Sequence, residues 1–198
     1  MEGGWVTNSH RWWNDPRGYE TLADVRQGEF DDSKEAHVNM MDFRINEVET
    51  WFDSSFDLVK KFIAEGGYRL YPDKISLPAE VDANSWVKIS HQWNNLGWGY
   101  CPTNLPGWSQ KYKVAFGLMN EQGDIVSSFV DTQTDWSTWL KDNPVLYDFS
   151  FLMDKNLQGQ YTWAVAIVDV TNHNTPGIMI SAKDNITTSG WLKLFDVV

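Results

Sequence analysis

The amino-acid sequence predicts a mainly β protein: an antiparallel β-sandwich, jelly-roll or immunoglobulin-like, with an N-terminal helical appendage. Two observations lead to this fold class. From residue 68 onward, apolar and polar residues alternate in short segments, which is the pattern of strands that bury one face. Short turn sequences with Gly and Asn separate these segments, whereas apolar residues take helical spacing over residues 45–65. Many short strands joined by short turns are typical of sandwiches.

Eight segments carry the strand pattern, and they are residues 68–72, 86–93, 112–119, 124–131, 145–153, 160–170, 177–182 and 191–198. The sixth is apolar on both faces, which alternate as Trp163, Val165 and Ile167 against Ala164, Ala166 and Val168. We therefore place this segment at the centre of a sheet, with Trp163 in the core. Residues 120–123 (Asn-Glu-Gln-Gly) predict a hairpin turn, and residues 156–159 predict another turn.

Residues 1–67 form a loop and helix segment that we expect to pack on the sandwich domain of residues 68–198. The first 44 residues are polar and irregular, so residues 28–33 are predicted to be a loop and residues 37–43 a short strand or helix. One broken helix or two short ones follow, with a capping box at Ser54 and Asp57 and a stop at Gly66-Gly67. The helical stripe that needs a partner comprises Val48, Phe52, Phe56, Val59, Phe62 and Ile63.

Composition and charge exclude several classes of partner. The net charge of -11 argues against nucleic acid and against an anionic membrane surface, because phosphates would be repelled. The single Cys101 excludes an intramolecular disulfide and a multi-cysteine zinc site. The chain has 12 tryptophans, too many to bury completely in one modest domain, so some are expected at the surface. We expect a monomer.

The first candidate site is the aromatic loop that follows residues 86–93. In that segment Val87, Ile89, His91 and Trp93 share one face, and Trp86, Lys88, Ser90 and Gln92 share the other. A flat aromatic ring can cover the C–H face of a sugar while neighbouring amides bond its hydroxyls. The loop offers Trp98, Tyr100 and Trp108 as planes, and Gln92, Asn94 and Asn95 as hydrogen-bonding groups. The alternative is that Trp93 and Trp98 seal the end of the sandwich.

The second candidate is the segment 134–140. Asp135 is placed to cap a helical turn, in which Trp136 and Trp139 share a face at i, i+3 spacing. They would add another sugar platform. The same spacing suits an anchor that holds the turn on the sheet, which is the interpretation favoured for Trp139.

The third candidate is the acidic cluster formed by Glu20, Asp24, Glu29, Asp31, Asp32 and Glu35. Two carboxylates about 5–10 Å apart across a cleft can hydrolyse a glycosidic bond. Carboxylates also bind calcium, although no EF-hand spacing is present. A run of acids is more often a solvated face. We expect no cofactor and no catalytic residue, and leave a structural calcium ion open.

Several short motifs carry a resemblance to a known family. They are His37-Val38-Asn39, Gly67-Tyr68-Arg69-Leu70, Trp93-Asn94-Asn95-Leu96-Gly97, Gly159-Gln160-Tyr161, the stretch from Trp163 to Asp169, Pro176-Gly177-Ile178 and Gly190-Trp191. Over residues 20–198 the chain resembles the tail of an uncharacterised bacterial family related to glycoside hydrolases, in which a TIM-like barrel precedes a C-terminal β-sandwich. The resemblance implies that residues 1–67 correspond to the last strand and helix of the barrel. This length cannot hold the eight strand–helix units of a working barrel. Gly28-Glu29 resembles the family's acidic barrel motif, whose partners would lie upstream.

These observations predict a non-catalytic carbohydrate-binding module of a secreted bacterial polysaccharide-degrading system, extracellular, with its signal peptide outside this chain. The expected ligand is a neutral plant polysaccharide or oligosaccharide of the β-glucan or xylan type, because a charge of -11 repels polyuronates. Two alternatives stay open. One is a structural C-terminal domain of a glycoside hydrolase that binds nothing itself. The other is a glycosidase fragment that uses Glu29 and Asp31.

Overall fold

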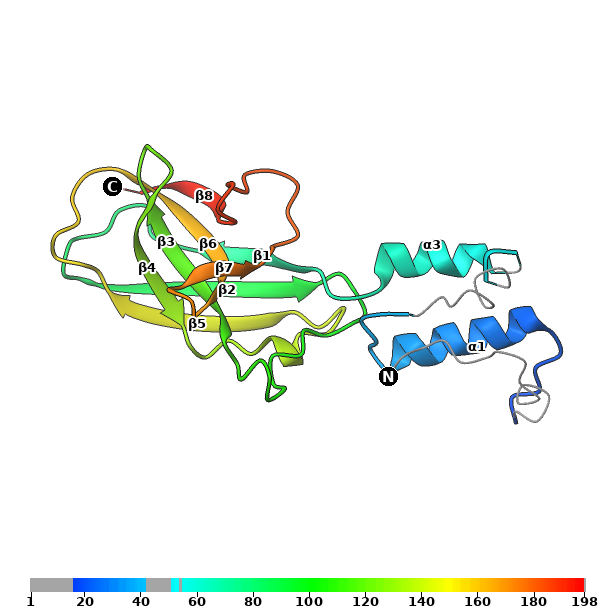
Figure 1. Cartoon of the computed structure of the whole chain (residues 1–198). Helices are drawn as coiled ribbons and strands as arrows, with labels where there is room; N and C mark the ends of the chain where they lie inside the picture. The colour runs from blue at the N-terminus through cyan, green and yellow to red at the C-terminus, as the bar shows by residue number, and fades with distance from the viewer. Residues whose placement is uncertain (1–15, 42–50, 54, 198) are drawn as a thin grey trace. The chain divides into compact units, whose positions relative to one another are not determined.

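The computed structural model describes residues 16–41, 51–53 and 55–197. The chain divides into two compact units (Figure 1). The helical unit comprises Met1–Tyr68 together with Leu96–Tyr100, and the sandwich unit comprises Arg69–Asn95 and Cys101–Val198. The segment Leu96–Tyr100 lies between two strands of the sandwich in the sequence, yet it belongs to the helical unit.

Helix α1, Leu22–Glu35, begins at a capping box. The Thr21 hydroxyl accepts a hydrogen bond from the Asp24 backbone N–H, and the Asp24 carboxylate accepts one from the Thr21 backbone N–H. Hydrogen bonds from the Thr21 side chain and backbone lower the pKa of Asp24. The prediction of a loop at residues 28–33 is therefore wrong. Gly28, which favoured that loop, lies inside the helix, and a Cβ at this position would collide with the Tyr19 ring.

Two helical pieces follow, as expected. Residues 51–53 are helical, and helix α3 spans Phe56–Glu65. Gly66 is its C-cap and Gly67 has a φ of 66°, so the predicted stop is confirmed. The N-cap is Ser55, which makes no side-chain cap hydrogen bond, and Ser54 of the predicted capping box lies outside the described residues. Residues 37–40 form neither strand nor helix, and residues 42–43 also lie outside the described part.

The helical unit has its own hydrophobic core, which contains Phe30, Val38, Met41, Trp51, Val59 and Trp98, with Leu58 and Phe62 packed against it. Five of the six core residues come from the N-terminal part of the chain. The sixth, Trp98, comes from the segment Leu96–Tyr100. The helices therefore bury part of their apolar faces around a tryptophan that is supplied from far along the sequence. Phe52, Phe56 and Ile63 of the predicted stripe are exposed, so the expectation that the whole stripe is covered is wrong.

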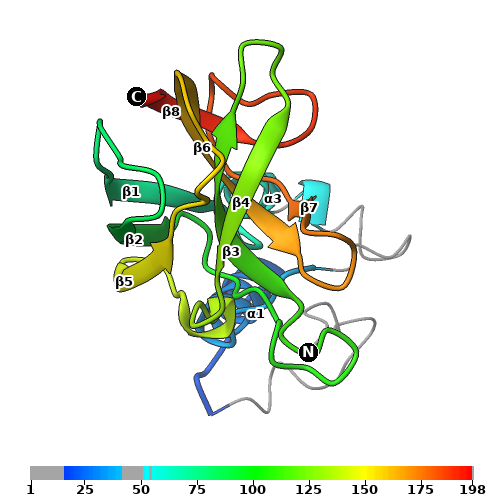
Figure 2. The ribbon, with the colours of Figure 1, turned by 90° about the vertical axis from the view of Figure 1, so that its left-hand side faces the viewer.

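Eight strands are present, as expected, and form two antiparallel sheets (Figure 2). The seventh lies earlier than predicted, because β7 ends at Ile178 and residues 179–182 of the expected segment are in no strand. Their bounds are β1 Leu70–Ser76, β2 Trp86–Asn95, β3 Tyr112–Met119, β4 Ile125–Asp131, β5 Val145–Leu152, β6 Tyr161–Asp169, β7 Thr175–Ile178 and β8 Leu192–Val197. The smaller sheet has the order β1-β2-β5. The larger has the order β4-β3-β6-β7, with β8 also paired to β6. The sandwich prediction is confirmed, and so is the central place of β6.

The turn between β3 and β4 is the hairpin turn that the sequence predicts at residues 120–123. Gly123 has a φ of 88°, and the Asn120 side chain accepts a hydrogen bond from the Asp124 N–H at 2.8 Å. This local chemistry joins the two strands into a hairpin.

The larger sheet is covered on both faces. On the inner face, Trp163 is fully buried and its indole N–H donates to the Pro78 carbonyl at 3.0 Å, which confirms its core position. On the outer face a second cluster forms from Ala115, Met119, Ala164, Ala166, Val168 and Trp191. Gly117 leaves room for the Trp191 ring, since a Cβ there would lie 3.0 Å from it. The smaller sheet shares the inner core, and its outer face is treated below as the candidate site.

A buried polar link joins the two sheets. His91 Nε2 on β2 lies 3.0 Å from a carboxylate oxygen of Asp131 at the end of β4, and both side chains are buried. The Trp93 indole N–H donates to His91 Nδ1 at 2.9 Å. Because an indole N–H can only donate, Nδ1 is the acceptor, and the His91 Nε2–H donates a hydrogen bond to the Asp131 oxygen. The second Asp131 oxygen accepts from the Gln133 backbone N–H.

Candidate functional site

Four of the eight sequence-predicted binding residues are buried: Asn95, Trp98, Trp136 and Trp139. The interpretation of these three tryptophans as exposed sugar platforms is therefore wrong, and the alternative favoured for Trp139 was already that of an anchor. The physical reason is the same for all three, because each indole N–H is satisfied by a buried or half-buried protein acceptor while its ring packs on other rings.

Trp98 is 2% exposed in the core of the helical unit. The Phe30 ring contacts it edge-on at 5.0 Å, and the Phe62 ring lies at 5.4 Å. Its indole N–H donates to the Val38 carbonyl at 2.9 Å, and its own carbonyl accepts from His37 Nδ1 at 2.8 Å. A sugar cannot reach this ring without opening the helical core.

Trp136 and Trp139 form a cluster with Trp93 inside the sandwich unit. The Trp139 ring stacks on Trp93 at 5.4 Å and lies 4.3 Å from the Trp136 ring. The indole of Trp136 donates to the Tyr112 carbonyl, and that of Trp139 donates to the Tyr147 hydroxyl, both at 2.7 Å. The anchor interpretation of Trp139 is confirmed. The Asn95 amide belongs to the same construction, because it donates to the Trp139 carbonyl at 3.0 Å.

Asp135 caps the short helical turn η2, Trp136–Thr138, as predicted. Its carboxylate accepts from the Ser137 hydroxyl at 2.6 Å and from the Ser137 N–H at 3.0 Å. Gln110 and Thr103 also approach the same oxygen, at 3.2 and 3.4 Å, and connect the turn to the loop that carries Trp108. Burial acts to raise the pKa of Asp135, but the hydrogen bonds from Ser137, Gln110 and Thr103 outweigh it and hold the pKa below its usual value of 3.8.

The lowered pKa of Asp135 predicts a dependence of stability on acid. Because the folded state prefers the carboxylate, this contribution is complete above about pH 4 and is lost as the pH falls through the folded pKa. Thermal melts of the wild type and Asp135→Asn between neutral and acidic pH measure it. The variant should be less stable at neutral pH by about 1 kcal/mol and should lose less stability on acidification. Parallel curves for the two proteins would show that Asp135 does not contribute in this way.

Trp108 and Tyr100 remain half-buried but belong to different units. In the sandwich unit the Trp108 ring packs edge-on against Tyr112 at 5.3 Å. Lys111 lies 4.8 Å from the centre of the Tyr112 ring and 3.2 Å from an Asp169 oxygen. In the helical unit the Tyr100 carbonyl accepts from the Asn39 side chain at 2.9 Å. The Trp108 ring is thus partly exposed to solvent although one edge packs on Tyr112.

The remaining two predicted residues, Gln92 and Asn94, lie on the outer face of β2. The burial pattern of this strand alternates, with Trp86, Lys88, Ser90, Gln92 and Asn94 on the outer side. Trp86 is 74% exposed, the highest value for a large hydrophobic side chain in the described part of the chain. Sequence reasoning placed Trp86 on a face with three polar residues but did not select it as a site. The position of Trp86 on this polar face could have identified it as a site residue, because a tryptophan that alternates with the polar residues of a strand is exposed to water.

Neighbouring strands extend this face on both sides. On β5, Leu152 lies opposite Trp86, Ser150 opposite Lys88, Asp148 opposite Ser90 and Leu146 opposite Gln92. On β1, Ser76 lies opposite Ser90, Lys74 opposite Gln92 and Tyr71 opposite Asn94. We call this surface, formed by the outward residues of β1, β2 and β5, the outer face. In Figure 2 the three strands lie at one side of the sandwich, with no other strand of that unit beyond them.

The charges of the outer face balance. Lys88 lies 3.6 Å from an Asp148 oxygen, and both side chains are exposed. The Gln92 amide donates to an Asp73 oxygen at 2.6 Å, where the bulge in β1 brings the carboxylate beside β2. Lys74 supplies the second positive charge of the face. The exposed tryptophan is therefore combined with hydroxyls, amides, balanced charges and the exposed apolar side chains of Leu146 and Leu152.

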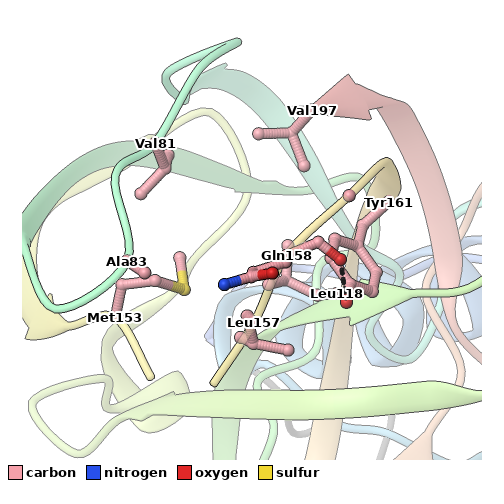
Figure 3. Close-up of a pocket in the computed structure, with 9 residues that line it drawn as sticks. Val81, Ala83, Leu118, Met153, Leu157, Gln158, Tyr161 and Val197 are labelled. Atoms are coloured by element: carbon pink, nitrogen blue, oxygen red, sulfur yellow. Dashed lines mark hydrogen bonds between the residues drawn. The ribbon is translucent and has the colours of Figure 1, made fainter. Parts of the chain in front are cut away.

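A cavity of about 60 Å³ opens at one end of the sandwich (Figure 3). It is lined by Val81, Ala83, Leu118, Met153, Leu157, Gln158, Gly159, Tyr161 and Val197. The Tyr161 hydroxyl donates to the Gln158 carbonyl, and the Gln158 side chain is directed toward Met153. Ligand pockets usually hold about 300–1,000 Å³, so this cavity is too small for a sugar ring.

The acidic cluster lies on α1 and the segment before it. Its carboxylates are engaged locally: Glu29 pairs with Arg26 at 2.9 Å, Asp32 with Arg17 at 2.8 Å, and Asp31 accepts from Gln27 at 3.0 Å. An open groove of about 540 Å³ lies along this helix and is lined by Arg17, Gly18, Tyr19, Glu20, Asp24, Gln27, Gly28 and Asp31. Glu29 and Asp31 are carried by one helix, whereas glycosidase carboxylates face each other across a cleft.

Two further findings concern the described part of the chain only. Within it, no group of three or more His, Cys, Asp or Glu side chains is arranged to hold a metal ion. None of its helices combines the length and the apolar character that crossing a bilayer requires.

Comparisons with known proteins show low similarity. No family model matches the chain, and no curated protein matches it. Among solved structures, the chain is similar to a crystal structure of the CARDB domain of the PF1109 protein from Pyrococcus furiosus in complex with di-metal ions. The identity is 15%, the match covers 66% of this chain and 86% of that one, and the TM-score is 0.35.

A solution structure of the same CARDB domain matches with 17% identity, covers 66% of this chain and 93% of that one, and has a TM-score of 0.36. The alkylpurine DNA glycosylase AlkC of Pseudomonas fluorescens, bound to DNA with an abasic site analogue, matches with 10% identity and a TM-score of 0.31. That match covers 80% of this chain and 40% of the glycosylase. These comparisons show no glycoside-hydrolase family and no carbohydrate-binding module.

Proposed function

We propose that the chain is a non-catalytic carbohydrate-binding module, and that its ligand is a neutral polysaccharide held on the outer face of the smaller sheet. One observation carries this proposal: the 74% exposed indole of Trp86 stands at the head of a strand whose outward side chains are hydrogen-bonding groups. An exposed aromatic plane beside amides and hydroxyls is the combination that a sugar ring requires, since the ring has a C–H face and polar edges. The proposed site is therefore this sheet face and no longer the aromatic loop that the sequence suggested.

The contact area sets the expected affinity. Burying a whole tryptophan removes about 150–250 Å² from water, and one face is roughly half of that. At about 25 cal/mol per Å² the stacking contact contributes roughly 2–3 kcal/mol. With a second contact and the cost of ordering the sugar, this predicts dissociation constants in the millimolar to micromolar range.

Electrostatics favour an uncharged ligand. Lys74 and Lys88 balance Asp73 and Asp148 on the outer face, so the surface itself attracts neither sign strongly. The net charge of -11 on the whole chain repels polyanions. Neutral β-glucans and xylans are therefore favoured over polyuronates. A secreted polysaccharide-degrading system is the setting in which such a module would act.

The second candidate is a structural domain of a glycoside hydrolase that binds no sugar. The burial of tryptophans favours it, because Trp51, Trp93, Trp98, Trp136, Trp139, Trp163 and Trp191 are all buried. Their abundance is thus explained by packing. Trp86 is not explained in this way, and it distinguishes the two candidates.

Affinity electrophoresis against a panel of neutral and acidic plant polysaccharides tests the proposal. At least one neutral glucan or xylan should retard the wild type, and high salt should leave the retardation unchanged because stacking is weakly screened. Trp86→Ala should abolish it with little change in melting temperature. Phe195→Ala is the matched control, an exposed aromatic on β8 of the other sheet, and should migrate like the wild type.

Two outcomes would contradict the proposal. If no polysaccharide retards the wild type, the structural candidate is the better account. If the wild type is a dimer in sedimentation and Trp86→Ala is a monomer, a second copy of the chain covers the outer face instead of a glycan.

A further inference from the structure

The outer face is longer than one sugar ring. Trp86 and Asn94 are eight residues apart on β2, which corresponds to about 27 Å at the rise of an antiparallel strand. Tyr71 on β1 lies opposite Asn94, and its side chain is half-buried. Opposed residues of paired strands point to the same side of a sheet, so Tyr71 is an outer-face residue. The face thus has an aromatic side chain at each end.

The middle of the face is low and polar. Ser90 on β2 lies between Ser76 of β1 and Asp148 of β5. One step toward Trp86, Lys88 lies opposite Ser150, and its ammonium group is drawn toward Asp148. Serine side chains give this region little height, while their hydroxyls are available along its length. A flat chain can lie over these serines, and along β2 it then passes the longer side chains of Lys88 on one side and Gln92 on the other.

We propose that the glycan is bound as an extended chain of several sugar units that lies along β2 and contacts Trp86 and Tyr71 together. This inference rests on the proposed function and adds the shape and length of the ligand to it. A single sugar covers one aromatic ring and gains one contact. A chain that reaches both rings gains the second contact at a high effective concentration, because the first contact already holds it on the face.

The inference predicts a dependence of affinity on chain length. Oligosaccharides of six units should bind about 10- to 100-fold more tightly than those of two units from the same polysaccharide. Cellobiose, cellotetraose and cellohexaose form one ladder, and xylobiose, xylotetraose and xylohexaose form the other. The ladder of the polysaccharide that retards the protein in the gel is titrated by calorimetry into the wild type, Tyr71→Ala and Phe195→Ala.

For the wild type and for Phe195→Ala, the affinity should rise strongly with the length of the oligosaccharide. Tyr71→Ala should bind the long and short oligosaccharides with equal affinity, and it should keep the weak binding of the disaccharide. Equal affinity of the disaccharide and the hexasaccharide for the wild type would overturn the inference and leave the proposed function standing. A polysaccharide panel without any retardation would instead remove the proposed function itself. If Tyr71→Ala is poorly folded, the dependence of wild-type affinity on oligosaccharide length still tests the inference.

Discussion

Trp98→Ala should destabilise the helical unit by about 3–5 kcal/mol, the usual cost of truncating a fully packed tryptophan. The indole loses its edge contact with Phe30, its contact with Phe62 and its hydrogen bond to the Val38 carbonyl. Because Trp98 is a member of that unit's core, amide hydrogen exchange should accelerate in α1 and α3. The strands of the sandwich unit serve as the internal reference in the same experiment.

Trp108→Ala provides the matched control, since it removes another tryptophan of the region between β2 and β3. Its ring is half-buried and packs on Tyr112 in the sandwich unit, so α1 and α3 should keep the exchange rates of the wild type. Unchanged exchange of α1 and α3 in Trp98→Ala would show that this tryptophan is dispensable to the helical core, against the packing described above.

His91→Ala should destabilise the sandwich unit by about 3–5 kcal/mol, because it leaves the Asp131 carboxylate buried without its principal side-chain donor. The loss exceeds that of an ordinary hydrogen bond, which contributes about 0.5–1.5 kcal/mol, since a buried polar side chain is left without its partner. Chemical denaturation of the variant beside the wild type measures the change in the free energy of unfolding.

A double-mutant cycle separates the pair from simple packing. In His91→Ala/Asp131→Ala the unpaired buried side chain is removed, so the double variant should be more stable than the sum of the two single effects implies. Strict additivity would mean that His91 and Asp131 contribute independently and that the polar link between the sheets is unimportant.

The β part of the fold could be predicted because its signals are local. In β2 the alternation from Trp86 to Asn94 separates the outer face from the buried Val87, Ile89 and Trp93 without knowledge of any partner strand. The turn at Asn120–Gly123 similarly requires only nearby groups. The candidate site was partly readable for the same reason, since Gln92 and Asn94 were selected and Trp86 lay on the face already assigned.

Helix α1 was missed although a local signal was present. Thr21 stands three residues before Asp24, the spacing of the capping box that the structure contains. The acids and Gly28 that follow favoured a loop, and propensity alone does not show that Gly28 leaves room for the Tyr19 ring.

The position of Trp98 could not be read from sequence at all. Periodicity describes which face of its own element a residue occupies, whereas Trp98 is in a loop with no period. Its burial depends on Phe30 and Val38, which lie 60 or more residues away. Close approach of Gly97 and Gly99 to the Gly67 backbone fixes the segment there, and this is a tertiary property.

The central claim, that the outer face and not the aromatic loop binds sugar, is tested most directly by calorimetric titration of Trp86→Ala beside Trp108→Ala. The titrant is the neutral polysaccharide that retards the wild type in the gel. Trp86→Ala should bind about 30- to 150-fold more weakly, which corresponds to the loss of roughly 2–3 kcal/mol of stacking. Trp108→Ala should bind like the wild type. Full affinity in Trp86→Ala, with loss of binding in Trp108→Ala, would contradict the claim and return the site to the loop.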